Sequence, residues 1–430
     1  MLRRLFSKDG RDYLLTFITE FTVLVAGVLV YKLAKEKLGD DGFSEYSIGR
    51  RTASFIQPLL ILGLGVGIPR YVAFALHDER MKTKGSYFVS GSILVACVTI
   101  PVLAILIFFS SFFSGLFFGS PSYASLIPFI CALILGMVIH STVYGYFRGL
   151  SKMVQANLLQ VFNLGLVPIA AFYSGKNIAE VLLITGGTWT ISSLLVFFYL
   201  LATEKWAGSE IGVCIRELFN YGIQRVPGDV ALAGFLALPA YFAAHVVDDN
   251  LKTAGYVAFG MSLLNMAGAA FGPICLILLP KASEVIVKKD FNLLGVYVTR
   301  ITLLTLLLTA VGLLLAESFT AFFLDIYLGD PSPSLVFITR VILFGAAGFT
   351  LYISLRSILD AYYVKAVNTL NIFISFVFFL LASAVIRYTG VSWGLDGILY
   401  VFVMSMWILG ALTYFTSAGI VRRKGNAGLN

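Results

Sequence analysis

Twelve apolar runs, each near the length of about 20 residues that a helix needs to cross a bilayer, constrain this chain more than any other feature. The composition agrees, because 59% of the residues are hydrophobic and 13% are charged, against about a quarter charged in soluble proteins. We therefore predict an all-α integral membrane protein with twelve transmembrane helices, and exclude a soluble enzyme or a nucleic-acid-binding protein. The predicted helices cover approximately 13–34, 48–76, 85–109, 123–147, 154–173, 178–201, 218–246, 253–279, 295–316, 335–359, 367–386 and 395–417.

The orientation follows from where lysine and arginine collect, because short cytoplasmic loops are enriched in these residues. With the N-terminus inside, the cytoplasmic segments contain 19 of these bases and the outer loops contain six. We therefore expect a multi-pass protein of the cell membrane with both termini in the cytoplasm. The formal net charge of +8 fits contact with an anionic lipid leaflet, so no nucleic-acid partner is expected.

Metal and cofactor motifs are missing from the sequence. The four cysteines are widely spaced without a CxxC pair, and the three histidines are scattered, so we expect no metal site and no cofactor. No GxxxxGK[ST] string exists either, which removes ATP binding as an energy source. Any transport would then be passive or coupled to an ion gradient.

An internal repeat divides the chain after the sixth predicted helix. An offset of 211 residues aligns Gly49 with Gly260 and Asn157 with Asn368, and it also places Pro69 and Arg70 over Pro280 and Lys281. Because six helices separate equivalent positions, both halves would keep the same orientation. We predict two six-helix lobes, 1–205 and 206–430, related by a pseudo-two-fold axis along the membrane normal.

Two stretches carry a resemblance to a known family. These are GDDGFSEYSIGRRTASFIQPLLILGLGVGIPRYVA, with its Gly-rich run into Pro-Arg, and YGYFRGLSKMVQANLLQVFNLGLVP, where Arg-Gly precedes a short polar turn. Both resemble the polysaccharide flippases of the O-antigen and exopolysaccharide type, which share a superfamily with multidrug and toxin extrusion exporters and lipid II flippases. The resemblance implies two lobes facing a central cavity, lined by helices 1 and 7, with transport by alternating access.

Ionisable residues inside spanning helices are costly, so they are candidates for function. Glu20 lies in helix 1, and Arg225 and Asp229 lie in helix 7 on either side of Pro227, where we expect a local break. A guanidinium fork suits a phosphate group, so Arg225 is a candidate for substrate binding, with Asp229 or Glu20 as the coupling or gating group. The structural alternatives are an i, i+4 pair of Arg225 with Asp229, and hydrogen bonds from neighbouring threonines to Glu20.

Three further arginines, Arg50, Arg51 and Arg340, begin predicted helices near the outer face. They are also candidates for binding substrate in the cavity, although snorkelling to the lipid headgroups explains each of them as well. His140 has a structural reading, as a hydrogen-bonded residue between helices, and a functional one, as a proton relay.

We predict a flippase, not an enzyme, that moves a lipid-linked oligosaccharide or polysaccharide precursor from the cytoplasmic to the outer leaflet. Its partners would be this lipid-linked glycan, membrane lipids and a coupling ion, H+ or Na+. The first alternative is an ion-coupled multidrug or cation exporter of the same fold. The second is a membrane glycan polymerase or ligase, which the short outer loops disfavour.

Overall fold

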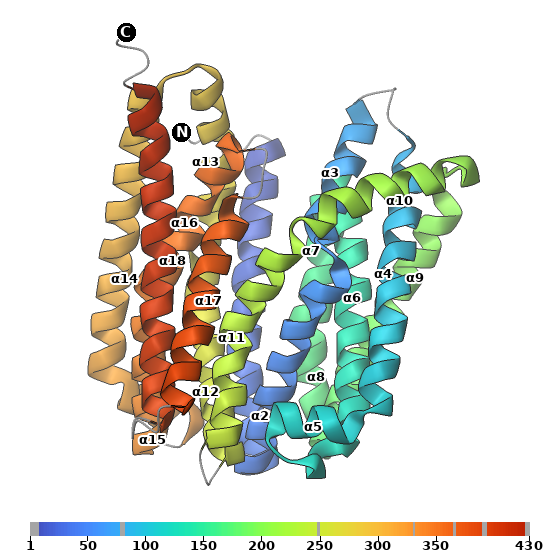
Figure 1. Ribbon diagram of the computed structural model, residues 1–430. Helices are drawn as coiled ribbons and strands as arrows, with labels where there is room; N and C mark the ends of the chain where they lie inside the picture. The colour runs from blue at the N-terminus through green and yellow to red at the C-terminus, as the bar shows by residue number, and fades with distance from the viewer. Residues whose placement is uncertain are drawn as a thin grey trace. The chain divides into compact units, whose positions relative to one another are not determined.

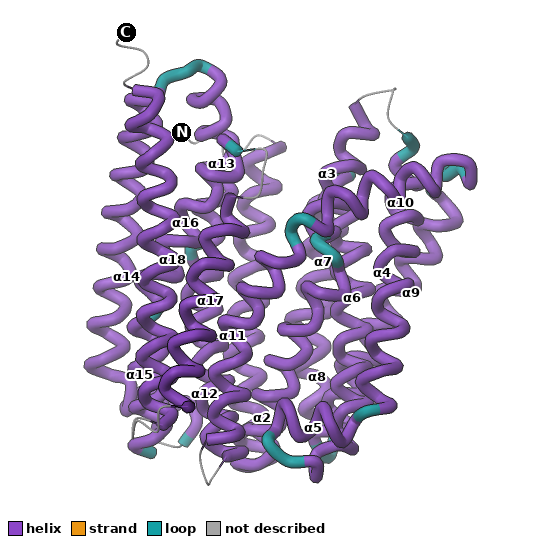
Figure 2. Tube along the Cα trace, in the orientation of Figure 1, coloured by secondary structure: helices purple, strands orange, loops and turns teal. Residues whose placement is uncertain are grey.

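The computed structural model describes residues 8–77, 82–246, 250–329, 332–363, 367–388 and 394–425. Within these ranges every regular element is helical (Figures 1 and 2). By contacts the chain divides into two compact units, Met1–Ala233 and Gly234–Asn430. Helices of the first unit are α2 (Lys8–Ile61), α3 (Leu64–His77), α4 (Lys84–Phe108), α5 (Ser110–Phe118), η1 (Pro121–Leu126), α6 (Ile127–Gly149), α7 (Met153–Gln160), η2 (Val161–Leu166), α8 (Val167–Ser174), α9 (Ile178–Thr203) and α10 (Gly208–Ile223). Helix α11 (Val226–Val246) begins in the first unit and continues into the second, followed by α12 (Asn250–Ala270), α13 (Gly272–Val287), α14 (Phe291–Leu328), α15 (Pro333–Phe344), α16 (Ala346–Tyr362), α17 (Val367–Tyr388) and α18 (Gly394–Gly425).

The 54 residues of α2 form two antiparallel arms joined at Gly39. A straight helix of this length would measure about 80 Å, far more than the thickness of a bilayer. Gly39 has φ 71° and ψ −164°, a conformation that residues with a side chain rarely adopt. As a result the Tyr31 and Tyr46 rings lie 5.6 Å apart across the turn. Helix α2 therefore supplies the first predicted span and the start of the second.

The twelve predicted helices are confirmed. Ten described segments are long and apolar enough to cross a membrane. One of them is the double arm of α2, which counts as two spans, and the span predicted at 253–279 is the twelfth. The predicted span 253–279 corresponds to α12 and α13, which are separated by a turn at Phe271. The predicted span 335–359 is likewise divided into α15 and α16, at Gly345.

Each unit packs its fourth and sixth spans tightly through glycine. In the first unit, a Cβ added to Gly136 of α6 would lie 2.6 Å from the carbonyl oxygen of Gly186 in α9. In the second unit, a Cβ on Gly410 of α18 would lie 2.7 Å from the carbonyl oxygen of Gly348 in α16. Small residues let membrane helices approach closely enough for backbone contact. The same two helices of each unit thus pack in the same way, as an internal repeat requires.

The second and eighth spans are also interrupted at corresponding places. Leu62 and Gly63 separate the second arm of α2 from α3, and Phe271 separates α12 from α13. Leu62 has φ 54° and Gly63 has φ 68°, so the first interruption is a left-handed turn. The side chain of Pro280, one of the residues aligned by the repeat, lies outside the described part of the chain. The lobe boundary after residue 205 stays a prediction.

Helix α10 crosses one end of the first unit, opposite the turn of α2 (Figure 1). It is fastened to the start of α4, because the Thr83 amide and hydroxyl both donate to Glu210 Oε2 at 2.9 Å. Tyr87 donates to Glu217 of α10 at 2.6 Å. Lys84 pairs at 2.8 Å with Glu204, the residue that follows the end of α9. The predicted start of helix 7 at residue 218 is wrong, because a separate amphipathic helix ends at Ile223 and the spanning helix begins at Val226.

Candidate functional site

The interruption of the second span lies directly against the turn between α10 and α11, both within the first unit. A Cβ on Gly63 would come 2.8 Å from the Gly222 carbonyl oxygen and 3.1 Å from the Arg225 Cβ. A Cβ on Gly222 would come 2.1 Å from the Leu62 carbonyl oxygen. Figure 2 shows the two interruptions as short loop segments. This backbone contact fixes the position of Arg225.

Arg225 is the residue from which α11 starts. Its amide donates to the Gly222 carbonyl at 2.8 Å, and its carbonyl accepts the amides of Gly228 at 3.1 Å and Asp229 at 3.0 Å. Pro227 therefore lies in the first turn of α11, where its missing amide hydrogen costs nothing. The break is before Pro227, at Gln224 and Arg225, and not at the proline as the sequence suggested.

The Arg225 guanidinium, on a half-buried side chain, lies over an aromatic ring. Its Cζ is 4.9 Å from the Tyr221 ring centroid, and the Arg70 Cζ is 5.2 Å from the same centroid. Tyr71 packs edge-on against Tyr221 at 5.8 Å. Two cations thus share one aromatic ring beside the N-terminus of α11. The N-terminus of a helix itself attracts negative charge. We call Arg70, Tyr221 and Arg225 the two-arginine cluster.

Asp229 lies in the first turn of α11 and is exposed. A carboxylate there is stabilised by the helix dipole, which gives it a structural reason to be present. Its role in coupling or gating stays a prediction.

Glu20 is exposed on the first arm of α2 and contacts the fifth span. Its Oε1 accepts a hydrogen bond from Gln160 Nε2 at 3.0 Å, one turn beyond Asn157, whose Nδ2 donates to Thr16 Oγ1 at 3.2 Å. The carboxylate is thus held by an amide from another helix. The sequence had suggested its neighbouring threonines as partners.

A buried polar network lies farther along the fifth span, where residues 161–166 form a π-helix. Asn163 Nδ2 is 3.0 Å from His140 Nδ1 and 3.2 Å from Ser193 Oγ, and Ser192 donates to Asn163 Oδ1 at 2.8 Å. The Trp189 indole donates to the Asn163 carbonyl oxygen. Short π-helical segments within α-helices are frequent at functional sites. His140 is thus hydrogen-bonded to Asn163 of the fifth span. Its role as a proton relay stays a prediction.

Arg50 and Arg51 differ in environment although they are neighbours. Arg50 Nη1 donates to the Tyr46 hydroxyl at 3.0 Å, and its Cζ lies 5.6 Å from the Tyr31 ring centroid. Arg51 is only 6% exposed. Helix packing in the first unit therefore holds both side chains, and substrate binding by either one stays a prediction.

Arg340, in the second unit, is paired with α14. Its Nη2 donates to the Glu317 carbonyl oxygen at 2.7 Å, and its Nε lies 3.5 Å from Glu317 Oε2. This contact supplies a structural reason for the arginine. Its proposed role in substrate binding stays a prediction.

Among the described residues, no group of three or more His, Cys, Asp or Glu side chains could hold a metal ion. The sequence missed two members of the two-arginine cluster as functional residues. In the sequence, Arg70 stands out only as a repeat position aligned with Lys281, and Tyr221 is one of 21 tyrosines with no distinguishing neighbour. The amphipathic period of GSEIGVCIRELFNYGI, which ends beside Tyr221, is the one signal that could have separated α10 from helix 7.

Comparison with known proteins identifies the fold. The MatE family model matches residues 16–173, from α2 to α8. An inward-facing multidrug resistance MATE transporter of the MOP superfamily is similar with a TM-score of 0.70 and 12% identity, covering 95% of this chain and 96% of that one. The lipid II flippase MurJ, in an inward closed conformation, is similar with a TM-score of 0.71 and 12% identity, covering 95% of this chain and 87% of MurJ.

A third similar structure is a MOP superfamily transporter from Pyrococcus furiosus, with a TM-score of 0.63 and 11% identity over 96% of this chain and 94% of that one. A search of curated proteins finds no significant match. The chain therefore has the twelve-helix fold of the MOP superfamily. This confirms the resemblance to the superfamily that holds the multidrug and toxin extrusion exporters and the lipid II flippases.

Proposed function

We propose that this protein is a flippase that moves a lipid-linked oligosaccharide or polysaccharide precursor from the cytoplasmic to the outer leaflet by alternating access. The observation that carries the proposal is the two-arginine cluster, with guanidinium groups 4.9 Å and 5.2 Å from one tyrosine ring. A diphosphate that links a glycan to its lipid carries closely spaced negative charges. Two guanidinium groups beside a helix N-terminus supply matching donors and positive potential.

The surroundings of the cluster leave both arginines accessible. Arg70 is exposed and Arg225 is half-buried. Glu217, which lies one turn before Tyr221, accepts a hydrogen bond from the Tyr87 hydroxyl at 2.6 Å. In the proposed mechanism Arg225 binds the diphosphate, and the turn at Gln224 lets α11 change its direction relative to α10. Arg50, Arg51 and Arg340 are retained as candidates for secondary contacts with the glycan.

Energy for transport would come from an ion gradient through Glu20, with Asp229 as the gating carboxylate. Glu20 is exposed on a spanning arm and bonded to a neutral amide from Gln160 at 3.0 Å. Binding of H+ or Na+ to this carboxylate would change its attraction for Gln160, and therefore the packing of the first arm of α2 on the fifth span. We propose that both termini face the cytoplasm; residues 1–7 and 426–430 lie outside the described part of the chain.

The second candidate function is an ion-coupled multidrug exporter, favoured by the similarity to the multidrug MATE transporter. Deletion of the gene in its host separates the two functions. A flippase deletion should lower surface glycan while lipid-linked glycan accumulates on the inner leaflet, with unchanged drug susceptibility. Raised drug susceptibility with normal surface glycan would favour the exporter instead.

A further inference from the structure

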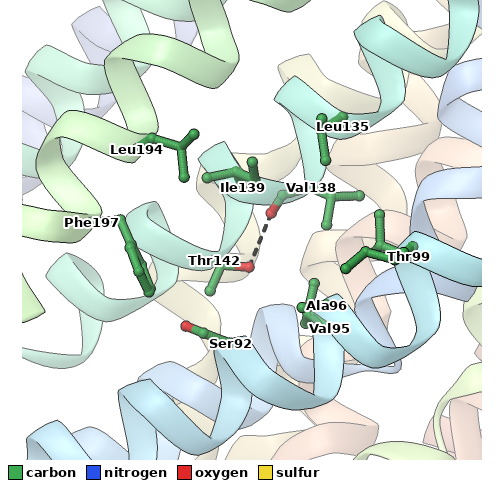
Figure 3. Close-up of a pocket in the computed structure, with 11 residues that line it drawn as sticks. Ser92, Val95, Ala96, Thr99, Leu135, Val138, Ile139, Thr142, Leu194 and Phe197 are labelled. Atoms are coloured by element: carbon green, nitrogen blue, oxygen red, sulfur yellow. Dashed lines mark hydrogen bonds between the residues drawn. The ribbon is translucent and has the colours of Figure 1, made fainter. Parts of the chain in front are cut away.

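A cavity of about 280 Å³ opens on the first unit between three spanning helices (Figure 3). Helix α6 forms its floor with Leu135, Val138 and Ile139. Helix α4 and helix α9 form the two walls, and Ile100 at the mouth is 67% exposed, so the cavity is open to the surroundings.

The lining of the cavity is apolar. Of its eleven lining residues three carry hydroxyls, and the remainder are aliphatic or aromatic. Ser92 donates to the Phe88 carbonyl at 2.8 Å. Thr142 donates to the Val138 carbonyl at 3.0 Å, as Figure 3 shows, so both hydroxyls are used within their own helices. Thr99 is only 2% exposed, and its hydroxyl has no hydrogen-bond partner among the described residues. The lining therefore offers no charge, and this one buried hydroxyl is its uncommitted polar group.

Aromatic rings pack beside Phe197, one of the lining residues. The Phe88 ring lies 5.3 Å from Phe197 and 4.5 Å from Tyr146, measured between ring centroids. Both pairs are tilted, with interplanar angles of 47° and 36°, and such aromatic contacts stabilise the wall that Phe197 forms. The cavity is thus a preformed pocket with an open mouth and a firm aromatic wall.

The surroundings of the mouth decide what can enter. All three helices are long and apolar enough to span the membrane. On α9, the residues next to the lining positions are exposed and apolar: Leu195 is 68% exposed and Phe198 is 59% exposed. A surface of this kind faces lipid chains, because the hydrocarbon layer contains almost no water. The available occupants are therefore hydrocarbon chains.

We propose that this cavity binds one acyl chain of a bilayer phospholipid. Its volume of about 280 Å³ lies just below the range of about 300 to 1,000 Å³ typical of ligand pockets, which suits a segment of chain better than a headgroup. A headgroup phosphate would also need a cation, and no lining residue carries one. Since lipid chains elsewhere are equally apolar, binding would rest on close packing in a fixed shape. The chain would fill the gap between α4 and α9 over α6.

The test uses the full-length protein in vesicles that contain a phosphatidylcholine with a diazirine near the end of one acyl chain. After irradiation, adducts are located by peptide mass spectrometry. We expect about fivefold or more labelling at Ile139 and Leu194 relative to the exposed Leu195. Ala96→Phe, which narrows the mouth, should reduce labelling of Ile139 to the level of Leu195. Ala104→Phe, at an exposed position of the same helix outside the cavity, should leave it unchanged.

Three results would overturn the proposal. Equal labelling of Leu194 and Leu195 would mean that the cavity holds no chain in preference to the surface. Loss of the Ile139 adduct on addition of unlabelled polyprenyl phosphate would assign the cavity to an isoprenoid chain. Cross-links between two copies through α4 would assign it to a protein partner. If Ala96→Phe does not accumulate, Leu194→Phe with Leu195→Phe as its control makes the same comparison.

Discussion

Gly222 and Leu62 meet backbone to backbone, so closely that a Cβ on Gly222 would lie 2.1 Å from the Leu62 carbonyl oxygen. This contact joins the interruption of the second span to the turn that starts α11. Both partners belong to the first unit, and the turn they brace holds Arg225.

Gly222→Ala should therefore destabilise the protein. The added methyl group meets backbone, which cannot move aside as a side chain would, so we expect a cost of about 1 to 3 kcal/mol or more. Thermal unfolding in detergent, followed by size-exclusion fluorescence, measures the effect. Gly212→Ala is the matched control, because it lies in the same helix with no heavy atom near the added Cβ. Equal melting temperatures for the two variants would contradict the packing described.

Replacing Arg225 separates a substrate-binding arginine from a structural partner of Asp229. Arg225→Lys keeps the charge but loses the planar fork, so surface glycan should fall partially, and Arg225→Ala should abolish most of it. If Arg225 only balanced the nearby carboxylate, Asp229→Asn would rescue Arg225→Ala. We expect no rescue at normal protein levels in the membrane; restored glycan in the double variant would refute substrate binding by this residue.

Glu20→Gln should abolish the dependence of transport on an ion gradient. The neutral amide can still bond Gln160, so folding should be retained, but the group can no longer exchange H+ or Na+. Transport in vesicles is measured with and without an imposed gradient of each ion. Glu36→Gln is the control, because Glu36 lies on the same helix and pairs with Lys32 at 3.6 Å. A Glu20→Gln protein that still responds to the gradient would exclude this carboxylate from coupling.

The attachment of α10 to α4 should weaken in acid. Hydrogen bonds from the Thr83 amide, and then from the Ser86 and Thr83 side chains, hold the pKa of Glu210 below its ordinary value of 4.5. A carboxyl whose pKa is lowered by folding stabilises the folded state above its unfolded pKa. The contribution is therefore complete at neutral pH and disappears as the pH falls below about 4.5.

Amide hydrogen exchange of α10 measures this acid sensitivity. Exchange, corrected for its intrinsic pH dependence, should rise on acidification in the wild type. In Glu210→Gln it should be high already at neutral pH and change little. A Glu210→Gln protein whose α10 is as protected as the wild type at neutral pH would show that other contacts hold this helix.

The spans were predictable from the sequence because about 20 consecutive apolar residues have few alternatives to a membrane helix. The repeat was predictable in part, because Gly49 and Gly260 each face an isoleucine: an added Cβ would lie 3.4 Å from Ile130 Cδ1 and 2.7 Å from Ile342 Cδ1. Sequence periodicity could not give the short α5, an apolar helix of nine residues that follows the third span directly. Its residues extend an apolar run without any change of composition.

Contacts between side chains that are far apart in the chain could not be predicted from the sequence. That Gln160 bonds Glu20, or that Arg70 and Arg225 share Tyr221, depends on how helices far apart in the chain rotate and pack. The π-turn at Asn163 is equally hidden, because the stabilising indole of Trp189 comes from another helix. Helix 7 started later than predicted because the amphipathic α10 continues the apolar pattern up to Ile223.

The most direct measurement is translocation of a fluorescent lipid-linked oligosaccharide in vesicles containing the purified protein, read as the fraction of label that a membrane-impermeant reductant can reach. The account predicts rapid exchange by the wild type, and a rate lower by about tenfold to a hundredfold for Arg225→Ala, as expected for loss of a charge-assisted bond to phosphate. Exchange no faster than in protein-free vesicles, or an Arg225→Ala rate equal to that of the wild type, would contradict it.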